Sequence, residues 1–313
     1  MTGPPVHAPE WTVGEGDASV RLDKFLADPA RLGSRSRAAT ALERGKVFLN
    51  GAEVGIADGA TRLRRGDLVR VWADRPGSSR APRVATGDLA IVYEDSTLIV
   101  INKPPGLLTV PLERQPASSS VRDQLREYLR PHRRHPFVVH RIDRDTSGLV
   151  LFAKSEAAQA MLKGQFRRRE PERTYWAVVY GHPQPASGVW QDHLVWDERA
   201  LIQKETHPDD PRAASAEARF RVLETFADTS LVEVSLVTGK RNQIRIQARL
   251  RGHTLVGEQR YVYGPDVLRP LSFPRQALHA RRLAFIHPDR DRPVSFEAPL
   301  PADMSELLSR LRR

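Results

Sequence analysis

One short polar segment holds most of the side chains in this sequence that could do acid–base or nucleophilic chemistry. It runs from His140 to Gly148, contains two aspartates, two arginines, a threonine and a serine, and leads directly into the apolar residues 149–153. A loop held by a rigid strand is a common place for catalytic groups. The same residues also suit a turn, in which Asp and Ser bond to nearby backbone and the arginines neutralise the aspartates. Spacing alone leaves both interpretations open.

A second polar segment runs from Thr238 to Arg245. It places a glycine and three basic residues where a helix is expected to begin. Backbone N–H groups and the helix dipole could hold a phosphate there. The spacing of a P-loop is absent, and a solvated basic turn is the simpler interpretation.

Three further segments also have two interpretations. Lys103 opens a Lys-Pro-Pro-Gly bend, which could be a plain turn. Tyr175 begins an expected strand, and a tyrosine at such a position is usually a half-buried residue of the core. Residues 167–169 are three arginines, which could bind phosphates or face solvent. The histidines are scattered without the spacing of metal ligands, so we expect no metal.

Composition narrows the class of protein. The 313 residues include 49 Lys and Arg against 38 Asp and Glu, which gives a formal net charge of +11 and suits a polyanionic partner. The sequence has no cysteine, which excludes disulfides and a thiol nucleophile. No apolar run approaches the roughly 18 residues of a membrane span, and the first residues do not resemble a secretory signal. We therefore expect a cytoplasmic protein that associates with nucleic acid and not with a membrane.

The chain divides into four parts by composition. Residues 1–16 are rich in Pro, Gly and acidic groups and predict a flexible lead-in. Residues 17–73 predict a small unit of two helices followed by short strands. Residues 74–87 contain Pro, Gly, Ser and Arg and predict a linker, after which residues 88–313 form the large domain.

In the large domain, apolar runs between turn residues predict many strands and a few helices. Helices are expected over residues 120–129 and 155–166, each with a serine N-cap, and from about residue 242 to 251. Strands are expected at residues 89–93, 98–101, 137–140, 148–153, 175–180, 216–223 and 231–236. This pattern predicts an α+β fold on a mainly antiparallel, mixed sheet.

Taken in order, these segments resemble the pseudouridine synthases of the RluA family. Residues 140–154 are the most specific block, being close to the family pattern H-R-L-D-x-x-T-S-G-L-L, and residues 94–106, 239–245 and 278–288 carry the rest. The N-terminal unit separately resembles an S4 RNA-binding domain, through Arg21-Leu22-Asp23-Lys24-Phe25-Leu26 and Asn50-Gly51 among other residues. This layout is common in the ribosomal-RNA branch of the family.

The resemblance implies an enzyme that breaks the glycosidic bond of a uridine in RNA, rotates the uracil and rejoins it through C5, with no cofactor and no metal. It places the essential aspartate at Asp143, not at Asp145. A carboxylate could attack the ribose or the uracil ring, or remove a ribose proton as a base, and the sequence leaves these routes open. A uridine inside a duplex must be flipped out to be reached.

The same resemblance implies the other roles. Arg245 pairs with the aspartate and keeps it ionised, and Tyr175 stacks on the uracil with its hydroxyl near the carbon that loses a proton. Leu278 supplies an apolar wall on the other side, and Arg141 fills the place that the flipped base leaves. The other residues expected to bind the substrate are Lys103, Thr146, Lys240, Asn242 and Gln243.

Some positions depart from the usual family pattern. Residues 240–242 read Lys-Arg-Asn where Arg-Thr-His is usual, Glu258 stands in place of an aspartate, and Arg173 in place of a lysine. Charge and hydrogen-bonding capacity survive, so we expect altered RNA contacts and unchanged chemistry.

We expect the N-terminal unit to bind RNA, chiefly at phosphates, through Arg21, Lys24, Arg35 and Arg37, with an affinity that falls as salt rises. A protein-docking module is the alternative. Ribosomal RNA of the large subunit is the favoured substrate and transfer RNA the alternative. We expect a monomer, because the RNA supplies the large partner surface.

Two other classes of function remain. A non-catalytic ribosomal-RNA binder or assembly factor could keep the fold, but the intact set of Asp143, Tyr175 and Arg245 weakens that reading. A glycoside hydrolase would need a second carboxylate within a few ångströms of Asp143. The sequence offers no convincing second acid, because Asp145 lies two residues on in an arginine-rich loop.

Overall fold

The computed structural model describes residues 9–43, 46–72, 89–111, 119–262, 265 and 269–313. The chain forms two units, Met1–Arg80 and Ala81–Arg313. The expected linker, residues 74–87, lies outside the described residues, as do residues 1–8 of the expected lead-in.

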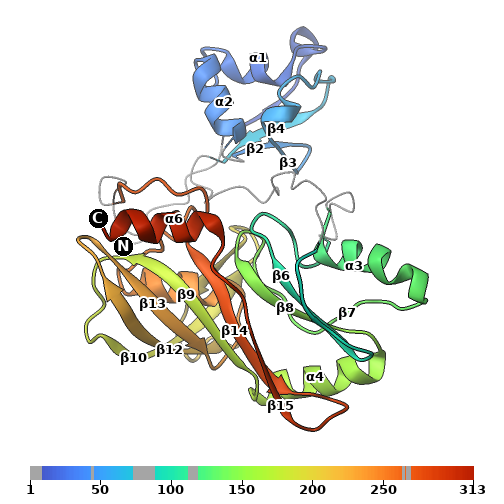
Figure 1. The fold of residues 1–313 in the computed structure, drawn as a ribbon. Coiled ribbons are helices and arrows are strands. Elements are labelled where there is room, and N and C mark those ends of the chain that lie inside the picture. Colours follow the sequence, from blue (N-terminus) through green and yellow to red (C-terminus); the bar gives the residue numbers. More distant parts are fainter. Residues whose placement is uncertain (1–8, 44–45, 73–88, 112–118, 263–264, 266–268) are drawn as a thin grey trace. The chain divides into compact units, whose positions relative to one another are not determined.

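The N-terminal unit contains two helices and a four-stranded antiparallel sheet (Figure 1). The helices are α1 (Leu22–Ala27) and α2 (Arg35–Glu43), and the strands in spatial order are β1 (Glu10–Thr12), β4 (Leu68–Val71), β2 (Val47–Leu49) and β3 (Ala52–Val54). Leu22, Phe25 and Leu26 are buried at helical spacing and share one core with strand residues. Asn50 and Gly51, both with positive φ, make the tight turn between β2 and β3.

Strand β1 corrects one expectation. Residues 1–16 were expected to be flexible, yet Glu10–Thr12 pair with residues 68–70 of β4, and Val13 is buried in the core. The apolar residues Trp11 and Val13 explain this, because they give the segment a face to bury.

The C-terminal unit is built on an eleven-stranded sheet. Nine strands follow the spatial order β11-β10-β12-β13-β9-β14-β8-β6-β5, while β15 pairs with β14 and β7 pairs with β8. The strands are β5 (Ile91–Glu94), β6 (Leu98–Lys103), β7 (Phe137–Val138), β8 (Ser147–Ala153), β9 (Glu172–Tyr180), β10 (Ser187–Asp197), β11 (Ile202–Glu205), β12 (Ala214–Thr225), β13 (Thr229–Leu236), β14 (Leu278–Ile286) and β15 (Pro293–Glu297). The mainly antiparallel, mixed sheet that was predicted is confirmed.

A single parallel contact joins the two halves of this sheet. Ser147 and Gly148 of β8 pair with His279 and Ala280 of β14. Gly148 has a φ of +107°, and a Cβ there would lie 2.2 Å from the carbonyl oxygen of Ala280. Glycine is therefore required for β8 to approach β14 this closely. The loop before β8 and the first residues of β14 are thereby brought side by side.

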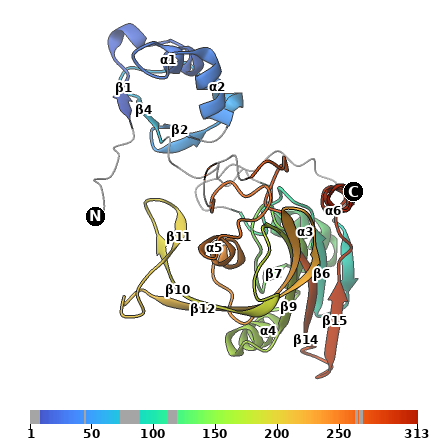
Figure 2. The same ribbon diagram turned by 90° about the vertical axis from the view of Figure 1, so that its left-hand side faces the viewer.

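Helices pack on opposite faces of the sheet. They are α3 (Val121–Leu129), α4 (Glu156–Arg168), α5 (Gln243–Leu250) and α6 (Ala302–Leu311). Figure 2 shows α5 inside the curve of the sheet, where Ile244 and Ala248 pack with Ala177 of β9. Val178, the next residue of β9, points to the other face and packs with Leu307 of α6.

The predicted helices are confirmed together with their caps. Ser120 Oγ accepts a hydrogen bond from the N–H of Asp123, and Ser155 Oγ accepts one from the N–H of Ala158. Strands β10, β11 and β15, the strand character of residues 278–286, and helix α6 were not predicted.

Candidate active site

A cleft of about 610 Å³ opens in the C-terminal unit. Its walls come from the loop before β8, the start of β9, the turn before α5, the end of α4, and Leu278 at the start of β14. These are the segments that the sequence singled out, and the sheet order explains how they meet. The turn that precedes α5 directly follows β13, and β13, β9, β14 and β8 are consecutive neighbours in the sheet.

Asp143 and Arg245 meet in this cleft. The Nη1 atom of Arg245 lies 3.0 Å from Oδ2 of Asp143, although the residues are 102 positions apart in the sequence. The side chain of Asp143 is 26% exposed and that of Arg245 is 10% exposed. Asp143 lines the cleft, and among the described residues Arg245 is the one side chain that donates a hydrogen bond to its carboxylate, at Oδ2.

Glu258 holds Arg245 from the other side. Its two oxygens accept hydrogen bonds of 2.6 and 2.7 Å from Nε and Nη2 of Arg245, and its side chain is fully buried. Backbone N–H groups of Arg260 and Tyr261 also donate to Glu258. Sequence reasoning noted the unusual glutamate at this position but assigned it no role.

The charges of this cluster follow from its contacts. Burial by itself lowers the pKa of Arg245, but the carboxylates of Glu258 and Asp143 outweigh burial and raise it above its ordinary value. Burial by itself raises the pKa of Glu258, but Arg245 and the backbone donors lower it below its ordinary value. Arg245 and Glu258 are therefore both charged and form a buried ion pair.

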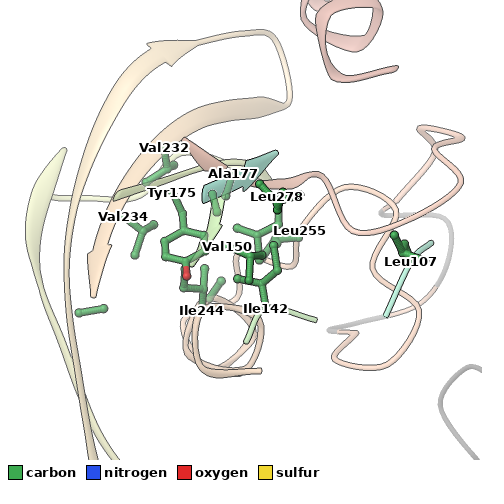
Figure 3. Packing of buried hydrophobic residues seen from close by; sticks show 14 of the residues in the cluster. Leu107, Ile142, Val150, Tyr175, Ala177, Val232, Val234, Ile244, Leu255 and Leu278 are labelled. Atoms are coloured by element: carbon green, nitrogen blue, oxygen red, sulfur yellow. The ribbon is translucent and has the colours of Figure 1, made fainter. Parts of the chain in front are cut away.

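Tyr175 and Leu278 supply apolar walls beside the carboxylate. Figure 3 shows the ring of Tyr175 among Val234, Val150 and Ile244, with Leu278 nearby. Burial raises the pKa of the Tyr175 hydroxyl; the charge of Arg173 lowers it and that of Asp143 raises it, with a net increase. The hydroxyl therefore keeps its proton at neutral pH.

Lys103 does not reach the cleft, so the expected substrate contact is wrong. Its side chain is fully buried, and Nζ donates hydrogen bonds to the carbonyl oxygens of Pro104, Leu107 and Arg144, at 2.9, 2.8 and 2.7 Å. Burial lowers the pKa of Lys103 to about 7. Its role is to hold the backbone of the loop that carries Asp143.

Three other predicted residues line the cleft but use their polar groups inside the protein. Thr146 accepts a hydrogen bond from Gln276. The side chain of Gln243 accepts from the N–H of Lys240 and so closes the turn before α5. Asn242, with a φ of 54°, accepts from Arg245 and donates to Tyr261. Their side chains shape the cleft and its turn.

Predicted Arg141 and Lys240 line the cleft together with further cations that the prediction did not include. The added residues are Lys163, Arg167, Arg169 and Arg173. With Arg245 the lining contains seven basic side chains, and Asp143 is its one acidic side chain among the described residues. The run of arginines at residues 167–169 was the available sequence signal. This imbalance suits a polyanion.

His140 and Arg173 support the walls. His140 stacks on Phe166, and its Nε2 accepts a hydrogen bond from the N–H of Leu151. Burial lowers the pKa of His140 to about 3, so it is neutral. Arg173 donates to the carbonyls of Leu236 and Thr238, so it braces the end of β13.

The glycosidase alternative needs a second acid in the cleft, but among the described residues Asp143 is the one acidic side chain that lines it. Both oxygens of Glu258 are bonded to Arg245, and Asp145 is paired with Arg144 at 3.0 Å. Within the part of the chain that the structure describes, no group of three or more His, Asp or Glu side chains could hold a metal ion. No described helix is long and apolar enough to cross a membrane.

Known proteins resemble this chain along most of its length. Residues 97–250 match the family described as RNA pseudouridylate synthase, and this region contains Asp143, Tyr175 and Arg245. An uncharacterized RNA pseudouridine synthase of Bacillus subtilis, YlyB, is 34% identical over 96% of this chain and 97% of its own. Ribosomal large subunit pseudouridine synthase C of Vibrio cholerae is 33% identical over 96% of each chain. The solved structure of human RNA pseudouridylate synthase domain containing 4 shares the fold, with a TM-score of 0.59, 23% identity, and coverage of 71% of this chain and 93% of that chain.

Proposed function

This chain belongs to the RNA pseudouridine synthase family, and from that premise we propose that it converts uridine to pseudouridine in ribosomal RNA of the large subunit. The substrate is supported by the name of the Vibrio cholerae relative. In this reaction the bond from C1′ to N1 of the uracil breaks, a bond from C1′ to C5 forms, C5 loses a proton and N1 gains one.

The observation that carries this proposal is the carboxylate of Asp143, which is bonded to Arg245 through one oxygen, lines the cleft and is partly exposed. An ionised carboxylate in that position can attack carbon or take a proton. Attack on the ribose, attack on the uracil ring and removal of a ribose proton all require an ionised carboxylate. We assign Asp143 as the catalytic residue and Arg245 as the partner that keeps it ionised and directed.

The walls of the cleft suit a flipped uracil. Tyr175 and Leu278 line the cleft and offer apolar surface to it. Arg141 is exposed at the cleft, and we propose that its planar guanidinium occupies the place of the extruded base.

Unpaired cations at the cleft would bind the RNA backbone. Lys163, Arg167 and Arg169 are exposed and have no ion pair among the described residues. Arg141 and Lys240 likewise have none. Five cations without acidic partners can neutralise phosphates directly, and each phosphate contact adds to the salt dependence of binding.

We further propose that the N-terminal unit is an S4-like RNA-binding domain that extends from β1 at Glu10 to about residue 73, followed by a linker and the catalytic domain from residue 88. Lys24, Arg35 and Arg37 are exposed, and Arg21 is exposed and paired with Asp23 at 2.6 Å. We propose a cytoplasmic location, and we propose that the protein acts as a monomer because one chain carries both the cleft and these cations.

Pseudouridine mapping across total RNA, from cells with and without this protein, tests the proposal. We expect specific uridines of large-subunit ribosomal RNA to lose their modification when the protein is absent. If pseudouridine is lost only from transfer RNA, then transfer RNA is the substrate and not ribosomal RNA. An unchanged pseudouridine map would contradict the proposed synthase activity.

A further inference from the structure

The backbone of the catalytic loop is held by buried side chains on both sides of Asp143. Thr109 Oγ1 donates to the carbonyl of Ile142 at 2.9 Å, and Lys103 Nζ donates to that of Arg144 at 2.7 Å. Arg275 Nη1 donates to the carbonyl of Asp145 at 3.0 Å. The loop conformation is therefore fixed by donors from outside the loop, and Arg275 is the one among them that comes from the C-terminal part of the chain.

Arg275 also holds the opposite wall of the cleft. The same Nη1 atom lies 3.2 Å from the carbonyl oxygen of Leu278, and Nη2 lies 3.3 Å from Oγ of Ser147, the residue that begins β8. One guanidinium thus ties the backbone beside Asp143 to the backbone of Leu278. The distance between Asp143 and the apolar wall at Leu278 therefore depends on the side chain of Arg275.

Helix α6 fixes the position of Arg275. Asp303, the second residue of α6, accepts hydrogen bonds of 2.7 and 3.0 Å from Nε and Nη2 of Arg275. Arg275 is 6% exposed and Asp303 is 29% exposed. The helix itself is anchored, because Met304, Leu307 and Leu308 are buried in a core shared with β9.

A glycine allows the backbone at Arg275 to approach the turn that precedes Glu258. Gly257 has a φ of +73°, and a Cβ there would lie 1.9 Å from the carbonyl oxygen of Arg275. The segment that carries Arg275 is therefore packed directly against the turn that carries Glu258. Arg275 stands between the two backbone segments that bear the catalytic carboxylate and the partner of Arg245.

We propose that Arg275 and Asp303 are positioning residues for the isomerisation, so that the C-terminal helix sets the geometry of the catalytic loop. This inference rests on the proposed function. Every nitrogen of the Arg275 guanidinium has a protein acceptor, and neither residue lines the cleft. Both residues therefore act through the loop and not through the lining of the cleft.

The test uses the full chain and measures two quantities separately: the rate constant for a single turnover at saturating RNA, and the Kd for the same RNA. Asp303→Asn keeps the shape of the side chain and removes the charge that holds Arg275. Arg275→Lys keeps the positive charge but loses the planar fork that reaches both the loop and α6. Asp303→Glu restores the charge.

We expect Asp303→Asn and Arg275→Lys to lower the rate constant roughly ten- to a hundredfold, the scale of a small misplacement of a reacting group, and to leave Kd unchanged. Asp303→Glu should recover most of the rate. Glu297→Gln is the matched control, because it removes the partner that Arg281 contacts at 2.8 Å on the β14–β15 hairpin, away from the cleft lining. It should change neither quantity.

A wild-type rate constant in folded Asp303→Asn would overturn the positioning role, and so would a loss of rate matched by an equal loss of RNA affinity. Circular dichroism at the assay temperature establishes folding. If Asp303→Asn does not fold, the test passes to Arg275→Lys. A wild-type rate constant in folded Arg275→Lys would then overturn the inference. Absence of pseudouridine in the wild-type reaction would instead overturn the proposed function, and this inference with it.

Discussion

The guanidinium of Arg245 meets the carboxylate of Glu258 through two hydrogen bonds, of 2.6 and 2.7 Å, and both side chains are withdrawn from solvent. Two parallel bonds fix the plane and direction of a guanidinium. Only Nη1 remains to meet Asp143. Glu258 therefore fixes the orientation in which Arg245 contacts Asp143, the carboxylate to which we assign the reaction.

Glu258→Gln should damage both stability and turnover. Removing one partner of a buried ion pair costs about 3–5 kcal/mol, because the remaining charge is left uncompensated. We expect the free energy of unfolding in urea to fall by that order, and the turnover rate to fall because Arg245 loses its fixed orientation. Glu224→Gln serves as the control, since it breaks an exposed pair with Arg312. Equal stability of the two variants would show that Glu258 does not compensate Arg245.

Lys103→Met should show whether Lys103 supports the loop that carries Asp143 or binds the RNA. The methionine fills similar space but leaves three carbonyl oxygens without their donor. We expect lower stability and slower turnover with an unchanged Kd for RNA. Lys163→Met, at the exposed mouth of the cleft, should give the reverse: weaker binding and unchanged stability. A large rise in Kd for Lys103→Met would restore the substrate contact that the structure argues against.

His140 should make the fold labile in acid. Its pKa is about 3 in the folded protein against 6.5 for the ordinary group, so between these values the unfolded chain binds a proton that the folded chain does not. The free energy of unfolding therefore falls as pH decreases from 6.5 toward 3. His279, with a pKa lowered to about 4 chiefly by burial, acts in the same direction.

His140→Gln should flatten this dependence, measured as the urea midpoint at a series of pH values. The midpoint of the variant should change less between pH 6.5 and 4 than that of the wild type. His135→Gln, which alters an exposed histidine, should follow the wild type. If His140→Gln also follows the wild type, protonation of His140 does not limit the acid stability.

The N-terminal cations should appear in the salt dependence of RNA binding. Each phosphate contact contributes about one unit to the slope of log K against log salt concentration. We expect the double variant Arg35→Gln, Arg37→Gln to reduce that slope by up to about two units, whereas Arg221→Gln, which removes an arginine paired with Glu233, leaves it unchanged. An unaltered slope in the double variant would contradict RNA contact by α2.

Much of the fold could be predicted because local rules apply to it. Serine caps, apolar alternation and the Asn50-Gly51 turn are visible in single segments. Helix α6 had a usable signal, since Met304, Leu307, Leu308 and Leu311 recur at helical spacing. Strand β10 had a weaker one, because only Trp190 and Leu194 of its residues are fully buried and most of the strand is half-exposed.

The site could be predicted only in part. The resemblance identified Asp143, Tyr175 and Arg245, which share one cleft. It also placed Lys103 at the substrate, but Lys103 is buried and donates hydrogen bonds to three backbone carbonyls instead. The partnership of Glu258 with Arg245 depends on two segments meeting in space, and neither segment encodes it alone.

We propose that the carboxylate of Asp143 performs the isomerisation. Joining uracil through C5 expels the hydrogen on that carbon, so RNA carrying tritium at C5 of its uridines reports the reaction as tritium released to water. We predict release by the wild-type protein and none above the protein-free background by Asp143→Asn, with the same Kd for the RNA. Release by Asp143→Asn at the wild-type rate would contradict the account.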